Sequence, residues 1–152
     1  MWDWELVKSG VGPCRYDILA QYGNEDFRYT HAVSYWSSGE DYCLHNHAMY
    51  ELVYCVSGTA VYLADGVRYQ VAPRSLLIIN PTVPHKLFLD ADKPFERHIL
   101  YIYQAGNTSD LARLLAKGQP PVDGKPMGSA YYENADSLST DFDRMSTVSR
   151  SP

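Results

Sequence analysis

Three histidines and one glutamate have the residue types and the spacing of a site for a metal ion or a polar ligand. His45 and His47 are separated by one residue, Glu51 follows four residues later, and His85 comes after a Pro-rich turn. Alternate residues of a strand face the same side, so His45 and His47 can point inward together, with Glu51 opposite them across a turn. Three imidazoles and one carboxylate could hold Zn, Ni, Mn or Fe with positions left for water or a ligand. Neutral imidazoles can also bind the hydroxyls of a ligand directly, so the sequence leaves both chemistries open.

Short β-rich runs separated by turn signals carry these four residues. Such closely spaced strands predict an all-β barrel or sandwich. Asp65-Gly66 lies between two of the runs and predicts a tight hairpin, because its turn needs positive φ angles. The predicted strands are Tyr29–Trp36, Tyr42–His45, Glu51–Ser57, Ala60–Ala64, Val67–Val71, Ser75–Ile79, Lys86–Phe88 and Phe95–Tyr103.

The pattern after Tyr103 changes to helix and linker. Ser109–Lys117 predicts a short helix with Asp110 in its first turn and Gly118 after its end. Residues 118–128 are rich in Pro and Gly and predict a linker. A second helix is predicted over Asn134–Ser149, with an apolar stripe of Leu138, Phe142 and Met145. The stripe could pack on the chain's own barrel, but its narrowness favours a partner chain, so we expect these three residues to dimerise.

Composition narrows the class of protein. The 152 residues suffice for one domain, and the formal charge of −5, with no cluster of Lys or Arg, argues against direct DNA binding. Cys14, Cys43 and Cys55 form no CxxC pair, which favours buried thiols in a reducing compartment. The N-terminus has no signal-peptide pattern, and no run of about 20 apolar residues could span a bilayer. We therefore expect a cytoplasmic protein without a membrane partner.

The histidine-rich segment resembles the first conserved motif of the cupins. Gly39, His45, His47, Glu51 and Gly58 match every fixed position of that motif, G-x5-HxH-x3-E-x6-G. The second cupin motif is kept only in part. His85 is present, whereas Asn80, Thr82 and Leu89 stand where Pro, Gly and Asn are usual.

A narrower resemblance is to the N-terminal domain of AraC-type transcription regulators. It rests on the succession HNHAMYELVYCVSG, APRSLLIINPTVPH and FERHILYIY. The resemblance implies a cupin-like double-stranded β-helix, that is a jelly-roll barrel, with two C-terminal helices. It divides the chain into a sensing barrel over residues 1–105, with an N-terminal arm over about residues 1–12, and a helical dimerisation region over residues 106–152.

The same resemblance implies a function. A small effector, often sugar-like, would bind His45, His47, Glu51 and His85 in a homodimer, and DNA would be bound only through a C-terminal domain missing from this chain. The alternatives are a small metal-dependent cupin enzyme, such as a dioxygenase or isomerase, and a storage or carbohydrate-binding cupin. We expect a ligand-sensing domain and not an enzyme.

Other histidines and aromatic residues carry weaker signals. We interpret His31 and His98 as ordinary strand residues outside the pocket. Trp36, Tyr54, Tyr62 and Tyr101 are expected in the core or on a sheet face, and one or two of them could stack on a ring-shaped ligand.

Overall fold

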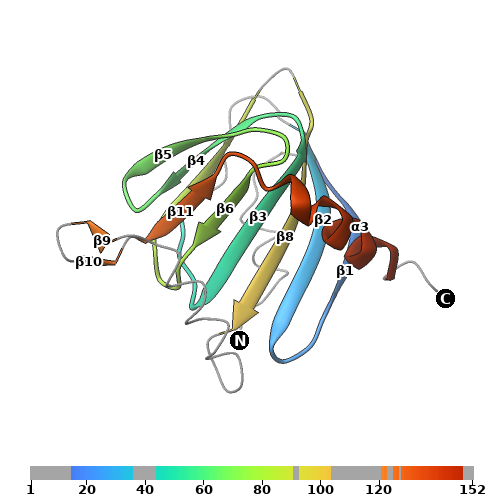
Figure 1. Cartoon of the computed structure of the whole chain (residues 1–152), viewed down its shortest axis with the longest axis horizontal. Helices are drawn as coiled ribbons and strands as arrows, with labels where there is room; N and C mark the ends of the chain where they lie inside the picture. Colours follow the sequence, from blue (N-terminus) through green and yellow to red (C-terminus); the bar gives the residue numbers. More distant parts are fainter. Residues whose placement is uncertain are drawn as a thin grey trace.

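Two antiparallel sheets, a small two-stranded hairpin and a C-terminal helix make up the described part of the chain (Figure 1). The computed structural model describes residues 15–35, 44–90, 93–103, 121–122, 125–126 and 128–148. In order across the larger sheet, its strands are β1 (Arg15–Gly23), β2 (Phe27–Tyr35), β8 (Phe95–Tyr103), β3 (Met49–Ser57), β6 (Leu76–Ile79) and β11 (Ser129–Tyr132). The smaller sheet has the order β5 (Val67–Val71), β4 (Ala60–Ala64) and β7 (His85–Leu89).

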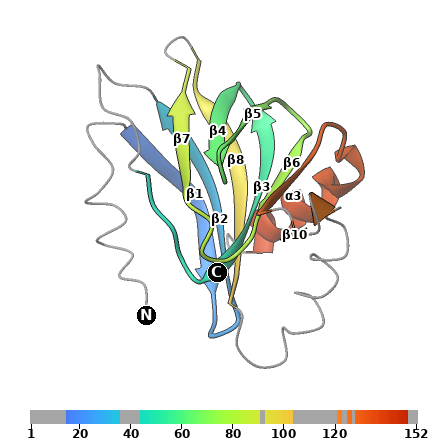
Figure 2. The ribbon, with the colours of Figure 1, turned by 90° about the vertical axis from the view of Figure 1, so that its left-hand side faces the viewer.

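A buried apolar core lies between the two sheets, which curve around it (Figure 2). It combines side chains from both sheets, such as Val53 and Leu77 from the larger one and Tyr62 and Leu87 from the smaller one. Inward and outward residues alternate along the central strands, as a sheet with two different faces requires. The all-β prediction is therefore confirmed.

Most predicted strands are present with small shifts of their ends. Ala60–Ala64, Val67–Val71 and Phe95–Tyr103 have the bounds predicted for them. Asp65 and Gly66 join the first two with φ angles of 51° and 75°, as the tight primed turn requires. The prediction of a strand over Tyr42–His45 is only partly tested, since residues 36–43 lie outside the described part, and His45 forms an isolated bridge with His85.

Two edge strands and one small hairpin were not predicted. β1 and β11 pair at opposite edges of the larger sheet, and β9 (Pro121–Val122) pairs with β10 (Lys125–Pro126) inside the segment predicted as a linker. The sequence RYDILAQYG of β1 alternates poorly, and the four residues of β11 are too few to show a period. Both segments form strands because their backbones pair with a neighbouring strand of the sheet.

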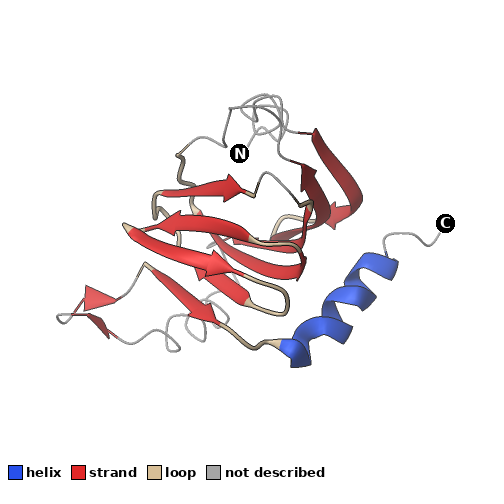
Figure 3. Cartoon of the chain, turned by 90° about the horizontal axis from the view of Figure 1, so that it is seen from above, coloured by secondary structure: helices blue, strands red, loops and turns tan. Residues whose placement is uncertain are grey.

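The second predicted helix is confirmed and covers the outer face of the larger sheet (Figure 3). A 3-10 turn, η2 (Asp136–Leu138), leads into α3 (Ser139–Val148). The first predicted helix, 109–117, and the N-terminal arm lie outside the described residues. No helix in the described part of the chain is long and apolar enough to cross a membrane.

The apolar stripe of α3 packs against the chain's own sheet. Phe142 is buried in a second core cluster, and Leu138 and Met145 pack against the edge of that cluster. The rings of Phe142 and Tyr54 stack with centroids 5.1 Å apart. The stripe thus has an intrachain contact, and a role in dimerisation for Leu138, Phe142 and Met145 stays a prediction.

Candidate metal centre

Backbone pairing brings the segment with His45 and His47 against the start of β7. His45 and His85 exchange both backbone hydrogen bonds, with N–O distances of 3.0 and 2.8 Å. The amide of Thr82 donates to the carbonyl of His47 over 2.7 Å. These bonds fix the two histidines before β3 begins, so their position is set by pairing with the 82–85 segment and not by a regular strand.

Glu51 enters the same site from the larger sheet. It lies in β3 directly opposite Ile79 of β6 and Tyr101 of β8, on the face that also carries Val53 of the inner core. Its side chain is buried, with 4% of the residue exposed. The carboxylate therefore depends on its neighbours in the site for hydrogen bonds.

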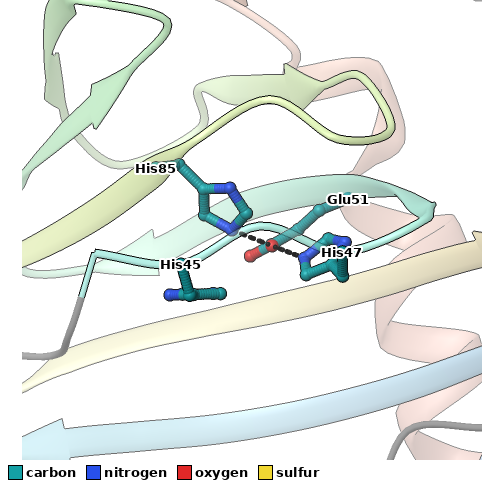
Figure 4. Close-up of side chains that lie close together, drawn as sticks. All are labelled: His45, His47, Glu51 and His85. Atoms are coloured by element: carbon teal, nitrogen blue, oxygen red, sulfur yellow. Dashed lines mark hydrogen bonds and ion pairs between the residues drawn. The ribbon is translucent and has the colours of Figure 1, made fainter.

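All four residues predicted from the sequence converge in space (Figure 4). One ligand atom from each of His45, His47, Glu51 and His85 lies within 4.8 Å of the others, and we call this group the His/Glu cluster. His47, Glu51 and His85 are buried, whereas His45 is partly exposed. His45 is therefore the most solvent-exposed member of the cluster.

Hydrogen bonds at the far side of two rings set which nitrogen faces the cluster. The Nδ1 atom of His47 lies 3.2 Å from the carbonyl oxygen of Met49, and Nδ1 of His85 lies 2.9 Å from that of Val83. A carbonyl can only accept, so both Nδ1 atoms carry the hydrogen in this assignment. Each ring then turns its Nε2 atom toward Glu51, the arrangement found when imidazoles bind metals through Nε2.

The two Nε2 atoms meet the same carboxylate oxygen. Oε2 of Glu51 is 3.0 Å from Nε2 of His47 and 3.0 Å from Nε2 of His85. The contact with His47 has hydrogen-bond geometry, but the Nε2 atom of His85 has no hydrogen-bond partner among the described residues, so its contact is a charge interaction. Two nitrogen lone pairs facing a carboxylate would repel it, so positive charge in the form of protons or a metal ion must lie between them.

Electrostatics in the cluster favours ionised groups. Burial by itself raises the pKa of Glu51, but the charge of His85 and the hydrogen bond with His47 outweigh it and hold that pKa well below its usual value. Burial likewise lowers the pKa of His85, and the charge of Glu51 more than reverses this, so the pKa of His85 is raised. Negative charge on Glu51 and positive charge beside it therefore stabilise each other, and a divalent cation can supply that positive charge in place of protons.

The residues present fit a metal ion. Three imidazoles and a carboxylate suit Zn, Ni, Mn and Fe, and the donor set does not choose among these metals. The buried Nε2 atom of His85 lies 3.0 Å from the Glu51 carboxylate but has no hydrogen-bond partner among the described residues. A metal bound to this atom would use the lone pair that no hydrogen bond satisfies.

Tyr101 is a residue of the site that the sequence did not single out from the other aromatic residues. Its ring lies edge-on to His47 with centroids 5.5 Å apart, and it pairs with Glu51 across the sheet. Val53 and Cys55 follow Glu51 at alternate positions on the inner face and are buried. Tyr54 points the other way and contacts α3 through Phe142.

His31 and His98 lie on the opposite face of the larger sheet. They contact Ser146 and Phe142 of α3, on the other side of the sheet from the His/Glu cluster. Their interpretation as residues outside the pocket agrees with this position. Their close pairing and their contact with the helix were not predicted, because only the strand register places them side by side.

One protein-family model matches more than half of the chain. The family model of the AraC-like ligand binding domain matches residues 29–145. No curated protein sequence matches the chain.

Solved structures with a similar fold are cupin barrels and related proteins of low sequence identity. A protein from Ralstonia eutropha JMP134, provisionally named a mannose-6-phosphate isomerase, is 16% identical, with a TM-score of 0.53 over 61% of this chain and 89% of that chain. The Cupin_2 domain of an XRE family transcriptional regulator from Enterobacter cloacae is 17% identical, with a TM-score of 0.50 over 60% of this chain and 98% of that chain. A provisionally named glyoxylate-induced protein from Pseudomonas aeruginosa is 16% identical, with a TM-score of 0.54 over 81% of this chain and 42% of that chain. At these identities the similarity supports the cupin fold alone.

Proposed function

The chain belongs to the family of AraC-like ligand binding domains, and from this premise we propose that it senses a small-molecule effector through a metal ion held by the His/Glu cluster. The ligand-binding role follows from the family. The metal, the contact residues and the link to transcription are the proposal.

One observation carries the proposal: the three histidines and Glu51 converge with their donor atoms turned inward. Nδ1 of His47 and Nδ1 of His85 are occupied by backbone carbonyls, so only the Nε2 atoms are left for the centre. A set of purely structural histidines would not need to bring two nitrogen atoms to 3.0 Å from one buried carboxylate oxygen. The desolvation of that carboxylate is costly unless a bound cation or proton compensates it.

Each residue has a separate part in the proposed site. His47 and His85 would hold the metal through Nε2, Glu51 would supply the negative charge, and His45 would bind from the exposed side. When bound, the metal would supply a Lewis acid for the oxygen atoms of an effector. Tyr101 beside His47 would contact the effector's apolar or ring portion.

Metal titration of the purified protein tests the site. We expect one equivalent of Zn²⁺, Ni²⁺, Mn²⁺ or Fe²⁺ to bind in calorimetry, and His85→Gln to abolish binding. His31→Gln is the matched control, because it makes the same change on the other face of the sheet. Absence of metal binding by the wild-type protein would contradict the metal part of the proposal. Direct binding of sugars or aromatic acids would then be measured on the metal-free protein.

The second candidate is a small metal-dependent cupin enzyme. The same three-histidine, one-glutamate set favours it, because such a set can hold a metal that polarises an oxygen or activates water. Turnover of a candidate substrate by the metal-loaded protein would establish it. Stable effector binding without turnover would favour the sensor.

Coupling to transcription needs two states with different affinity for the effector. We propose that the chain acts as a homodimer and that DNA is bound by a separate domain, as the family implies. Sedimentation of the protein with and without the effector tests the dimer. A monomer at all concentrations and in all ligand states would contradict this part of the proposal.

A further inference from the structure

A pair of buried histidines lies beneath α3, on the face of the larger sheet away from the His/Glu cluster. His31 of β2 and His98 of β8 are directly opposite in the strand register, and their ring centroids are 4.2 Å apart. They are 8% and 1% exposed. Neither has a part in the proposed ligand site, so their burial needs a separate explanation.

His98 is enclosed by aromatic rings. Its Nδ1 atom lies 2.7 Å from the hydroxyl of Tyr29, and its ring stacks on Phe142 of α3 with centroids 5.2 Å apart. The hydroxyl of Tyr29 can also donate to the carbonyl oxygen of Phe142 over 3.4 Å. His98 therefore lies in the contact between sheet and helix.

His31 links the helix to a glutamate. Its Nδ1 atom is 2.8 Å from the hydroxyl oxygen of Ser146 in α3, and its Nε2 atom is 2.7 Å from Oε1 of Glu96. Ser57 donates a further hydrogen bond to Oε2 of Glu96. Both ring nitrogens of His31 thus have an oxygen partner, one on α3 and one on β8.

The groups around His98 would stabilise a positive charge on its ring only weakly. The carboxylate of Asp143 in α3 is 3.8 Å from Nε2 of His98, but its side chain is 71% exposed, so solvent screens it. The ring of Tyr54 in β3 lies 6.1 Å from that of His98. On β1, Tyr22 packs on Tyr29. Asp17 of β1 pairs with Val33 of β2, and β2 separates it from the strand that carries His98. A charge on His31 would add repulsion at 4.2 Å.

We propose that His31 and His98 form a proton-sensitive clasp that holds α3 on the sheet when His98 is neutral and releases the helix when His98 is protonated. Helix α3 has ten residues, too few for a stable helix in water, so its release also unfolds it. A fall in pH thus weakens the contact between α3 and the larger sheet by protonating the buried ring of His98.

The direction of the pH dependence follows from the two states of His98. In the docked state, burial and then the neighbouring His31 lower the pKa of His98 to about 3. In the released state His98 meets water and regains an ordinary pKa near 6.5. The released state therefore binds the proton more tightly, and docking weakens as the pH falls below 6.5. Between pH 7.5 and pH 5.0 this difference makes release about 30-fold more favourable.

Hydrogen exchange on the full chain tests the clasp. We expect the protection factors of the α3 amides, corrected for intrinsic exchange rates, to fall about 30-fold from pH 7.5 to pH 5.0. Those of β8 serve as the internal reference. In His98→Phe, which keeps a ring between Tyr29 and Phe142 but cannot be protonated, the loss of protection should disappear. Equal pH dependence in the two proteins, or none in the wild type, would overturn the proposal.

A second measurement needs no variant. NMR titration of the wild-type imidazoles reports the protonation of His98 while the α3 signals report docking. We expect His98 to stay neutral as long as α3 is docked and to be protonated only together with its release. Protonation of His98 near pH 6.5 with α3 still docked would refute the clasp, even if His98→Phe does not fold.

Discussion

Replacing Glu51 by Gln is the sharpest test of the metal centre. The substitution keeps the shape of the side chain and removes its charge. In the structure the Glu51 oxygen is 3.0 Å from each of two imidazole nitrogens. Two unit charges at that separation interact by about 5.5 kcal/mol in a medium with an effective dielectric constant near 20. Desolvation offsets part of this, and removing one member of a buried charged pair costs about 3–5 kcal/mol.

The assay is thermal unfolding with and without metal. A ligand at 100 times its dissociation constant stabilises the folded state by about 2.7 kcal/mol, which raises the melting temperature of a domain of this size by roughly 5–10 °C. A loss of about 3 kcal/mol in metal binding weakens the affinity more than 100-fold. At the same metal concentration, the melting temperature of Glu51→Gln should then rise by only about 1 °C.

Glu96→Gln is the matched control, because it makes the same chemical change on the outer face of the same sheet. It should keep the full metal-induced rise in melting temperature. An equal rise in Glu51→Gln and wild type would refute the assignment of Glu51 as a metal ligand. A rise lost in both variants would mean that the loss is not specific to Glu51, and this too would contradict the assignment.

Three further outcomes follow from packing and backbone geometry. Phe142→Ala should lower the free energy of unfolding by about 3–5 kcal/mol in urea denaturation, because the ring is 6% exposed, whereas Val148→Ala, at 64% exposure, should leave it nearly unchanged. Gly58→Ala should cost more stability than Gly66→Ala. Both have positive φ, at 80° and 75°, but only at Gly58 would the added carbon overlap a backbone carbonyl oxygen. The Cys55 thiol should resist alkylation at pH 8 until the protein unfolds, since burial raises its pKa to about 12; rapid labelling of the folded protein at Cys55 would contradict this.

Strand alternation and turn chemistry let the sequence predict the barrel. The Asp65-Gly66 turn and the strands on either side of it follow from local rules, because φ preferences and side-chain alternation act within a few residues. The spacing of His45, His47 and Glu51 is likewise a local feature. A short turn is enough to bring side chains this close in sequence to the same site. Their grouping with His85 was predicted from the residue types, and the four side chains form one spatial cluster.

Contacts between residues far apart in sequence were decided only by the tertiary structure. The backbone hydrogen bonds of His45 with His85 and of His47 with Thr82, which set the position of both histidines, join two segments that are far apart in sequence. The pairing of His31 with His98 depends on the register between β2 and β8, and a shift of one residue would turn one of them to the other face. The stripe on α3 was predicted as a helix face, but a helical period cannot say which surface it covers. That choice depends on the long-range burial of Phe142 against Tyr54 and His98.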